Sequence, residues 1–144
     1  MREPWTELYV HLVWATWDRL PLLRPEFAQH VYSCLQEDCH RLKCEAIAIG
    51  GVEDHVHVLV RMHPAISVSD LVKQLKGSSS HLVTHRLQSG EPFKWQGAYG
   101  AFSVAKSEVP IVRRYIQNQE EHHRLGTFDE AMERMVYDNH IPGG

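Results

Sequence analysis

Three features are scarce in this sequence: cysteine, long apolar runs and net positive charge. Its 144 residues contain only three cysteines, which are spaced five residues apart and form no CxxC pair. This spacing predicts reduced thiols rather than a disulfide framework. No apolar run approaches the length that crosses a bilayer, and no signal peptide is readable at the start. We therefore expect a cytoplasmic protein without a membrane partner.

The charge distribution is more informative than its sum. The formal net charge is −3, which is not typical of a protein that binds nucleic acid. Between Arg61 and Arg114, however, the sequence holds eight basic residues against three acidic ones, and the acidic residues gather toward the ends. This middle region is compatible with a phosphate-binding face, and equally with a solvated charged surface.

The pattern of apolar residues predicts one domain that covers residues 1–144, in which helices and strands alternate. We expect strands over 7–17, 45–52 and 98–105, and a further strand that follows a glycine turn at 50–54 and ends before Pro64. We expect helices over 26–43, from 67 or 69 to 83 with a kink near 77–80, over 107–124, and over 127–139. This order predicts an α+β fold, the ferredoxin-like (RRM-like) βαββαβ antiparallel sheet with two additional C-terminal helices.

The most distinctive element is a pair of histidines two residues apart on the strand after the glycine turn. Side chains alternate between the faces of a strand, so His55 and His57 share one face while Val56, Val58 and Val60 point to the other. The ferredoxin-like order places this strand centrally in the sheet. A His-x-His pair is compatible with half of a metal site, and also with chance in a chain that holds 11 histidines.

A helix later in the chain offers the other half. Four residues recur there at helical spacing and form one stripe: Ile111, Tyr115, Gln119 and His123. Two imidazoles and one amide oxygen leave coordination positions open, as catalytic metal sites do, and favour Mg²⁺ or Mn²⁺, with Zn²⁺ as a further candidate. A phosphodiester bound there would face the phenol of Tyr115 as a nucleophile. The alternative is an ordinary amphipathic helix with a partly buried tyrosine.

Four segments together resemble the HUH superfamily, and within it the single-tyrosine transposases of minimal bacterial insertion sequences and their REP-associated relatives. The resemblance covers nearly the whole chain. Its segments are His11-Leu12-Val13-Trp14, Asp54-His55-Val56-His57-Val58-Leu59, the run from Trp95 to Val104, and the run from Tyr115 to His123.

The resemblance implies an enzyme and assigns its site. His55, His57 and Gln119 would be ligands of a divalent metal, and Tyr115 would be the nucleophile. Proteins of this family cut single-stranded DNA at the foot of an imperfect hairpin, form a 5′-phosphotyrosine link, and release a 3′-hydroxyl that later rejoins strands. They are typically homodimers in which active sites can be shared between subunits.

Hairpin binding would need contacts to phosphates and stacking on unpaired bases. The candidate cations are Lys73, Lys76, Arg86, Lys94, Arg113 and Arg114, with His81 and His85 nearby. Trp95 and Tyr99 are candidates for stacking, although such residues more often pack in a core or anchor a loop. The acidic C-terminal stretch, which includes Glu130 and Glu133, argues against a DNA path over the last helix.

Two other functions remain open at this point. The first is a catalytically inactive ferredoxin-like domain that binds structured nucleic acid. The second is a metal-dependent hydrolase that uses water and in which Tyr115 only positions the substrate. An enzyme that forms a covalent protein–DNA adduct is distinguishable from both.

Overall fold

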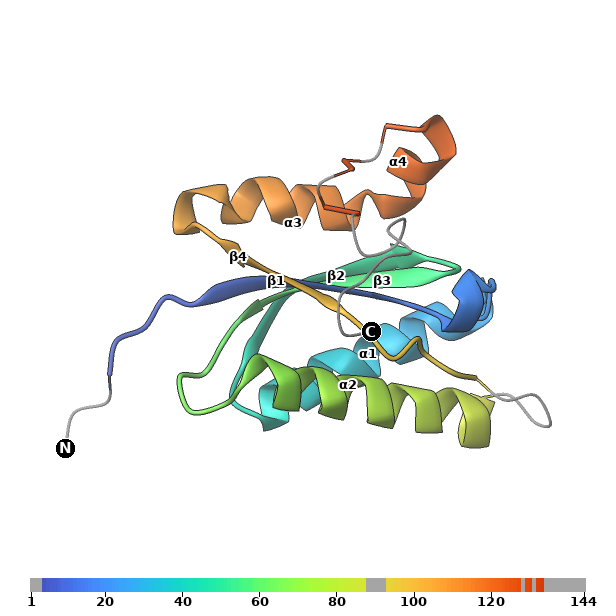
Figure 1. The fold of residues 1–144 in the computed structure, drawn as a ribbon, viewed down its shortest axis with the longest axis horizontal. Coiled ribbons are helices and arrows are strands. Elements are labelled where there is room, and N and C mark those ends of the chain that lie inside the picture. The colour runs from blue at the N-terminus through green and yellow to red at the C-terminus, as the bar shows by residue number, and fades with distance from the viewer. Residues whose placement is uncertain (1–3, 88–92, 128, 131, 134–144) are drawn as a thin grey trace.

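The computed structural model describes residues 4–87, 93–127, 129–130 and 132–133 (Figure 1). The strands are β1 (Tyr9–Ala15), β2 (Glu45–Val52), β3 (His55–Arg61) and β4 (Gly100–Val104). The α-helices are α1 (Pro25–Arg41), α2 (Val68–Leu82), α3 (Val109–Gln117) and α4 (Gln119–Leu125). No helix among these residues is both long and apolar enough to span a membrane.

The four strands form one antiparallel sheet in the order β2-β3-β1-β4. The expected ferredoxin-like topology is confirmed, with β3 in the interior of the sheet between β2 and β1. In the register of β1 with β3, Val13 lies opposite His57 and Ala15 opposite His55. The histidine pair therefore has a neighbouring strand on each side.

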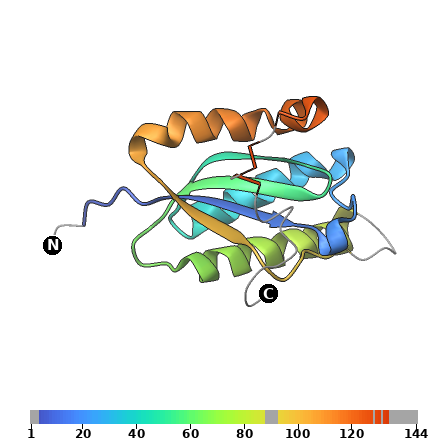
Figure 2. The same cartoon turned by 45° about the horizontal axis from the view of Figure 1, so that its top comes forward.

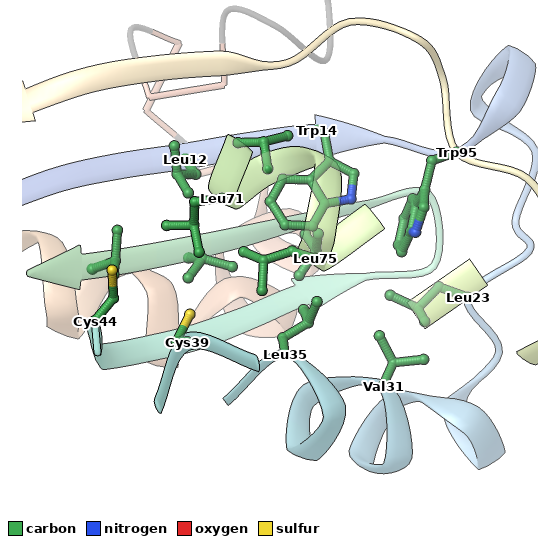
Figure 3. Packing of buried hydrophobic residues seen from close by; sticks show 14 of the residues in the cluster. Leu12, Trp14, Leu23, Val31, Leu35, Cys39, Cys44, Leu71, Leu75 and Trp95 are labelled. Carbon is green, nitrogen blue, oxygen red and sulfur yellow. The ribbon is translucent and has the colours of Figure 1, made fainter. Parts of the chain in front are cut away.

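The helices cover the two faces of the sheet as separate layers, with α1 and α2 on one face and α3 and α4 on the other (Figures 1 and 2). The larger core lies under α1 and α2, where Leu12 and Trp14 of β1 pack with Leu35 of α1 and Leu71 of α2 (Figure 3). A smaller apolar cluster lies under α3 and includes Leu59 of β3. The period of two along β3 thus separates a hydrophobic face from the face that carries the histidines.

Two expectations about glycine are wrong. Gly50 and Gly51 lie inside β2, and the turn to β3 consists of Glu53 and Asp54 alone. The kink expected near 77–80 is also absent, since α2 runs unbroken to Leu82 and continues as a π-helical turn over Val83–Leu87. Gly77 is exposed in the helix interior, where glycine lowers helix stability without breaking the hydrogen-bond ladder.

The helix expected over 107–124 is interrupted at Asn118, and a short 3₁₀ turn (Lys106–Glu108) precedes it. Asn118 has φ −111° and ψ 27°, and its side-chain amide donates a hydrogen bond to the carbonyl oxygen of Arg114 (3.0 Å). The asparagine thus ends α3 by a local bond that competes with the helix. The last helix expected over 127–139 lies largely outside the described residues, and those described between 127 and 133 are turn or irregular segments.

Candidate functional site

Strand β3 delivers both histidines to the face of the sheet that α3 and α4 cover. The side chains of His55 and His57 are fully buried there, and their rings meet edge to face with centres 5.1 Å apart. Val56, between them, points into the core under α1 and α2. The orientation expected from strand alternation is therefore confirmed.

Close packing of α3 on β2 brings the tyrosine to this pair. Gly50 is paired with His57 across the two strands, and a Cβ atom on Gly50 would lie 2.3 Å from the backbone oxygen of Ile116. Only glycine permits this approach, because every other residue would push α3 away from the sheet. Tyr115, the residue before Ile116, lies edge to face with His57 at 5.9 Å between ring centres.

The helix break at Asn118 directs the amide of Gln119 to the same place. Gln119 is buried, and its Oε1 atom lies 3.3 Å from Nε2 of His55. Ile111 of the predicted stripe is exposed, whereas three members reach the histidine pair: Tyr115, Gln119 and His123.

The inner nitrogen of each histidine is held by a neighbouring side chain. Nδ1 of His55 lies 2.7 Å from Oδ1 of Asp54, and Nδ1 of His57 lies 2.8 Å from Nε2 of His11. These bonds fix both rings so that their Nε2 atoms converge. His11 is buried, and sequence reasoning missed its role; the alternation of side chains along β1, with Val13 paired to His57, puts His11 on the same face of the sheet.

Glu133 is the second residue that the sequence did not identify. Its carboxylate is fully buried between the two imidazoles, although we expected an acidic surface in this part of the chain. Oε2 lies 3.0 Å from Nε2 of His55 and 3.1 Å from Nε2 of His57. Oε1 accepts a hydrogen bond from the hydroxyl of Tyr115 (2.6 Å) and lies 3.3 Å from Nε2 of His123.

These donor atoms fit a divalent ion. His55, His57 and Glu133 each offer a ligand atom, and all three atoms lie within 4.8 Å of one another. Adjacent ligands on an octahedral ion with bonds of about 2.1 Å lie about 3 Å apart. Glu133 Oε2 lies 3.0 Å and 3.1 Å from the two histidine Nε2 atoms, and Gln119 Oε1 lies 3.3 Å from that of His55. The set combines imidazole with hard oxygen and has no thiolate, which suits Mn²⁺ or Mg²⁺. Among the described residues, Gln119 Nε2 is buried without a hydrogen-bond partner.

Burial and neighbouring charges shift the pKa values of the site residues. Burial lowers the pKa of His55, but hydrogen bonds and charge from Asp54 and Glu133 outweigh burial and raise it to about 9. Burial dominates at His57 and lowers its pKa, and burial followed by the charge of His57 lowers the pKa of His11 to about 3. Glu133 has a lowered pKa, since its hydrogen bonds to the two site histidines outweigh its burial. At neutral pH, His55 is therefore protonated and lies between the carboxylates of Asp54 and Glu133.

The hydroxyl of Tyr115 is held from two sides. It donates to Glu133 and accepts a hydrogen bond from the backbone N–H of Asp129 (3.0 Å), while the ring of His122 stacks on the phenol at 4.8 Å. Burial, and then the hydrogen bond to Glu133, raise the pKa of Tyr115. The phenol is therefore protonated at neutral pH and lies within the same cluster as the candidate metal ligands.

The six candidate DNA-contacting cations do not form one patch. Lys73 and Arg86 are exposed on the α2 side of the sheet, and Arg113 and Arg114 are exposed on α3 on the opposite side. Lys76 is half-buried and donates to the backbone oxygens of Gln96 and Ala98, and the ammonium of Lys94 lies 4.0 Å from the ring centre of Trp17.

Trp95, a candidate for base stacking, is a core residue. Its indole N–H donates to Ser79 Oγ (2.9 Å), and its ring packs edge to face against Trp14 and Phe93. Tyr99 is half-buried and packs against the same core. Neither ring is presented as a free stacking surface.

Comparison with known proteins identifies the family. The family model described as "Transposase IS200 like" matches residues 5–119. Transposases for insertion sequence element IS200 from Salmonella typhimurium (strain LT2) and Salmonella typhi are each 29% identical over 122 residues, which cover 81% of this chain and 79% of each relative.

Solved structures agree. The crystal structure of a "putative transposase" from Deinococcus radiodurans R1 has a TM-score of 0.62 and 28% identity, and covers 83% of this chain and 95% of that one. The structure of the REP-associated tyrosine transposase bound to a REP hairpin has a TM-score of 0.63 with 12% identity, covers 88% and 74% of the two chains, and supports the fold. Because the family model spans most of the chain and includes both site histidines, Tyr115 and Gln119, this chain belongs to the IS200-like transposase family.

Proposed function

We propose that this transposase nicks hairpin-forming single-stranded DNA by attack of Tyr115 and rejoins strands from the covalent intermediate. The observation that carries the proposal is the contact of the Tyr115 hydroxyl with a carboxylate that also contacts both Nε2 atoms of the histidine pair. A nucleophile, two imidazoles and an amide oxygen thus meet in one buried cluster. Membership of a transposase family and a structural neighbour that binds a REP hairpin support DNA of this kind as the substrate.

The residues that would hold a divalent ion, Mg²⁺ or Mn²⁺, are His55, His57, Gln119 and Glu133. Such an ion would supply positive charge beside the non-bridging oxygens of the phosphodiester. Asp54 and His11 would keep the two imidazoles in the orientation that binding requires, since each holds an Nδ1 atom.

Tyr115 would carry the covalent chemistry. Its hydroxyl oxygen forms a bond to phosphorus while the bond from phosphorus to O3′ breaks; the phenol loses a proton and the departing O3′ gains one. The product is a 5′-phosphotyrosine and a free 3′-hydroxyl, and the reverse attack by a 3′-hydroxyl restores a phosphodiester. The N–H of Asp129, which donates to the phenol oxygen, would stabilise developing negative charge there.

Two features of the surface support a path for DNA to the site. A hollow of about 440 Å³, lined in part by Arg19, Asp54 and His123, lies beside the buried site and supports an approach from that side. Exposed Arg113 and Arg114 on α3 and Lys73 and Arg86 near α2 are the cations that we propose for phosphate contacts. We also propose a homodimer, which is typical of the family that the sequence resembles; a measurement of the oligomeric state tests it.

The test is the formation of a covalent protein–DNA adduct. Labelled single-stranded oligonucleotides that tile the DNA flanking the gene are incubated with the protein and Mn²⁺ or EDTA, then run on a denaturing gel. Tyr115→Phe and His57→Ala should abolish the adduct. The control Tyr9→Phe, which removes a tyrosine hydroxyl at the start of β1, should retain it. Cleavage without an adduct would indicate a water-using hydrolase, and binding without cleavage would indicate a nucleic-acid-binding module.

A further inference from the structure

Glu133 lies outside the segment that the family model matches, and its carboxylate nevertheless lies in the site. The family model ends at residue 119, whereas Glu133 lies 14 residues further along and still reaches the centre of the site. The chain gets there by reversing after α4, where Gly126 adopts φ +70° and the N–H of Thr127 bonds back to the carbonyl of His122 (2.9 Å). Backbone bonds from Glu133 N–H to the carbonyls of Asp129 and Glu130 then fix the turn that presents the carboxylate.

Both oxygens of this carboxylate lie 3.1 Å from Nε2 of His57, and they differ in their other partners. Oε2 also lies 3.0 Å from Nε2 of His55, so it contacts both of the imidazole nitrogens that would hold a metal ion. Oε1 accepts the hydrogen bond from the Tyr115 hydroxyl at 2.6 Å. One side chain therefore links the ligand set to the nucleophile.

We propose that Glu133 is a catalytic residue of the nicking reaction, which aims the Tyr115 hydroxyl with one carboxylate oxygen and contacts the metal ion with the other. This inference rests on the proposed function. The phenol oxygen is the reacting atom, and Glu133 touches it directly. The same segment adds the Asp129 N–H on the other side of that oxygen, so residues beyond α4 fix the nucleophile in two directions.

If Glu133 had a purely structural role, we would expect an apolar side chain at this position. A buried carboxylate is costly unless it is paired and hydrogen-bonded, and an apolar side chain would seal the segment against the sheet without that cost. Among the described residues, every polar partner of this carboxylate belongs to the site: the two strand histidines, His123 and Tyr115. The negative charge of Glu133 therefore lies beside the candidate metal ligands and the nucleophile.

The experiment compares Glu133→Gln and Glu133→Ala with the wild type and with Glu130→Gln, an exposed carboxylate on the same segment. Three quantities are measured: the single-turnover rate of adduct formation at saturating Mn²⁺, the affinity for hairpin DNA in EDTA, and the affinity for Mn²⁺ without DNA by calorimetry. Glu133→Gln keeps the shape of the side chain and an oxygen that accepts from Tyr115, so it separates the charge from the fold.

We expect both Glu133 variants to slow adduct formation by about 100-fold or more, with hairpin affinity unchanged. Glu133→Ala should also weaken Mn²⁺ binding by about 10-fold or more, while Glu130→Gln matches the wild type throughout. Wild-type rates in Glu133→Gln would overturn the proposal, and so would unchanged Mn²⁺ affinity in Glu133→Ala. A faster reaction in Glu133→Gln would also overturn it, because the carboxylate would then be a competitor for the place of the scissile phosphate.

The design separates this proposal from the proposed function. If the wild type forms no adduct with any oligonucleotide while Glu133→Ala still loses Mn²⁺ affinity, the nicking function fails and the metal contact of Glu133 stands. If the wild type forms the adduct and the Glu133 variants match it, the nicking function stands and the role of Glu133 fails.

Discussion

Gly50 is the residue on which the geometry of the site depends most directly, and Gly50→Ala tests that dependence. The added Cβ would lie 2.3 Å from the backbone oxygen of Ile116 and 3.2 Å from its Cγ2 atom. Backbone cannot rotate aside as a flexible side chain can, and real Cβ contacts stay beyond 3.0 Å. Helix α3 must therefore move away from β2 by roughly 1 Å, and Tyr115 moves with it. A displacement of this size of a reacting group costs on the order of 100-fold in rate.

The same substitution has a calculable effect on stability. Overpacking of this kind costs about 1–3 kcal/mol, partly offset by about 0.4–1 kcal/mol from the stiffer unfolded chain. The net loss is about 1–2 kcal/mol, and at about 2–4 °C per kcal/mol for a chain of this length the melting temperature should fall by about 2–8 °C. Circular dichroism melts measure the stability loss, and the single-turnover rate of adduct formation at a temperature where both proteins are folded measures the displacement.

Gly77→Ala is the matched control. Gly77 lies in the interior of α2, and a Cβ atom there would meet nothing within 4 Å. Alanine should raise the free energy of unfolding by about 0.5–1 kcal/mol through helix propensity and leave the adduct rate unchanged. If Gly50→Ala melts and reacts like the wild type, α3 is not held against the sheet as described, and the reasoning is refuted.

Four further predictions concern the histidine cluster and the tyrosine that contacts it. His11→Ala should weaken Mn²⁺ binding by about 10- to 100-fold, because His57 loses the bond that orients its ring; calorimetry measures this, with His63→Ala as an unaffected control. Because the pKa of His55 is raised to about 9, a metal ion must displace its proton, so Mn²⁺ affinity should rise by about tenfold per pH unit toward pH 9 and then level off. In the metal-free protein, protonation of His55 stabilises the fold fully below the unfolded pKa of about 6.5, and this stabilisation is lost as the pH rises through about 9. Urea midpoints should therefore fall over this range. Midpoints that do not change with pH would contradict the raised pKa of His55. Finally, Tyr115 faces His57 of its own chain, so a mixture of Tyr115→Phe and His57→Ala should stay inactive, and an adduct in the mixture would show that subunits exchange the tyrosine helix.

Much of the fold follows from periodicities that the sequence displays openly. Alternation on the third strand places His55 and His57 together on one face, because a period of two leaves no other choice once Val56 and Val58 enter the core. The helical spacing of Tyr115 and Gln119 likewise brings both to one side, even though Asn118 breaks the helix between them. The spacing survives the break because α4 resumes at once.

The rest depends on contacts that no local pattern encodes. Gly50 resembles a turn residue in the sequence, and its real function, the close approach of α3, becomes visible only when the two elements are packed. Glu133 belongs to a stretch whose composition predicts a solvated surface, and a chain reversal after Gly126 brings it into the site. His11 lies between these cases: its face follows from strand alternation, but its partner requires the register of β1 with β3.

The measurement that tests the central claim most directly is the location of the covalent bond in the DNA adduct. Trypsin cleaves after Arg114 and Arg124, so Tyr115 lies in a ten-residue peptide in which it is the sole tyrosine. After nuclease digestion of the DNA, mass spectrometry of this peptide should show a nucleotide attached through phosphate to Tyr115, in samples with Mn²⁺ and not in samples with EDTA. An adduct on another residue, or cleavage of the DNA with this peptide unmodified, would contradict the account.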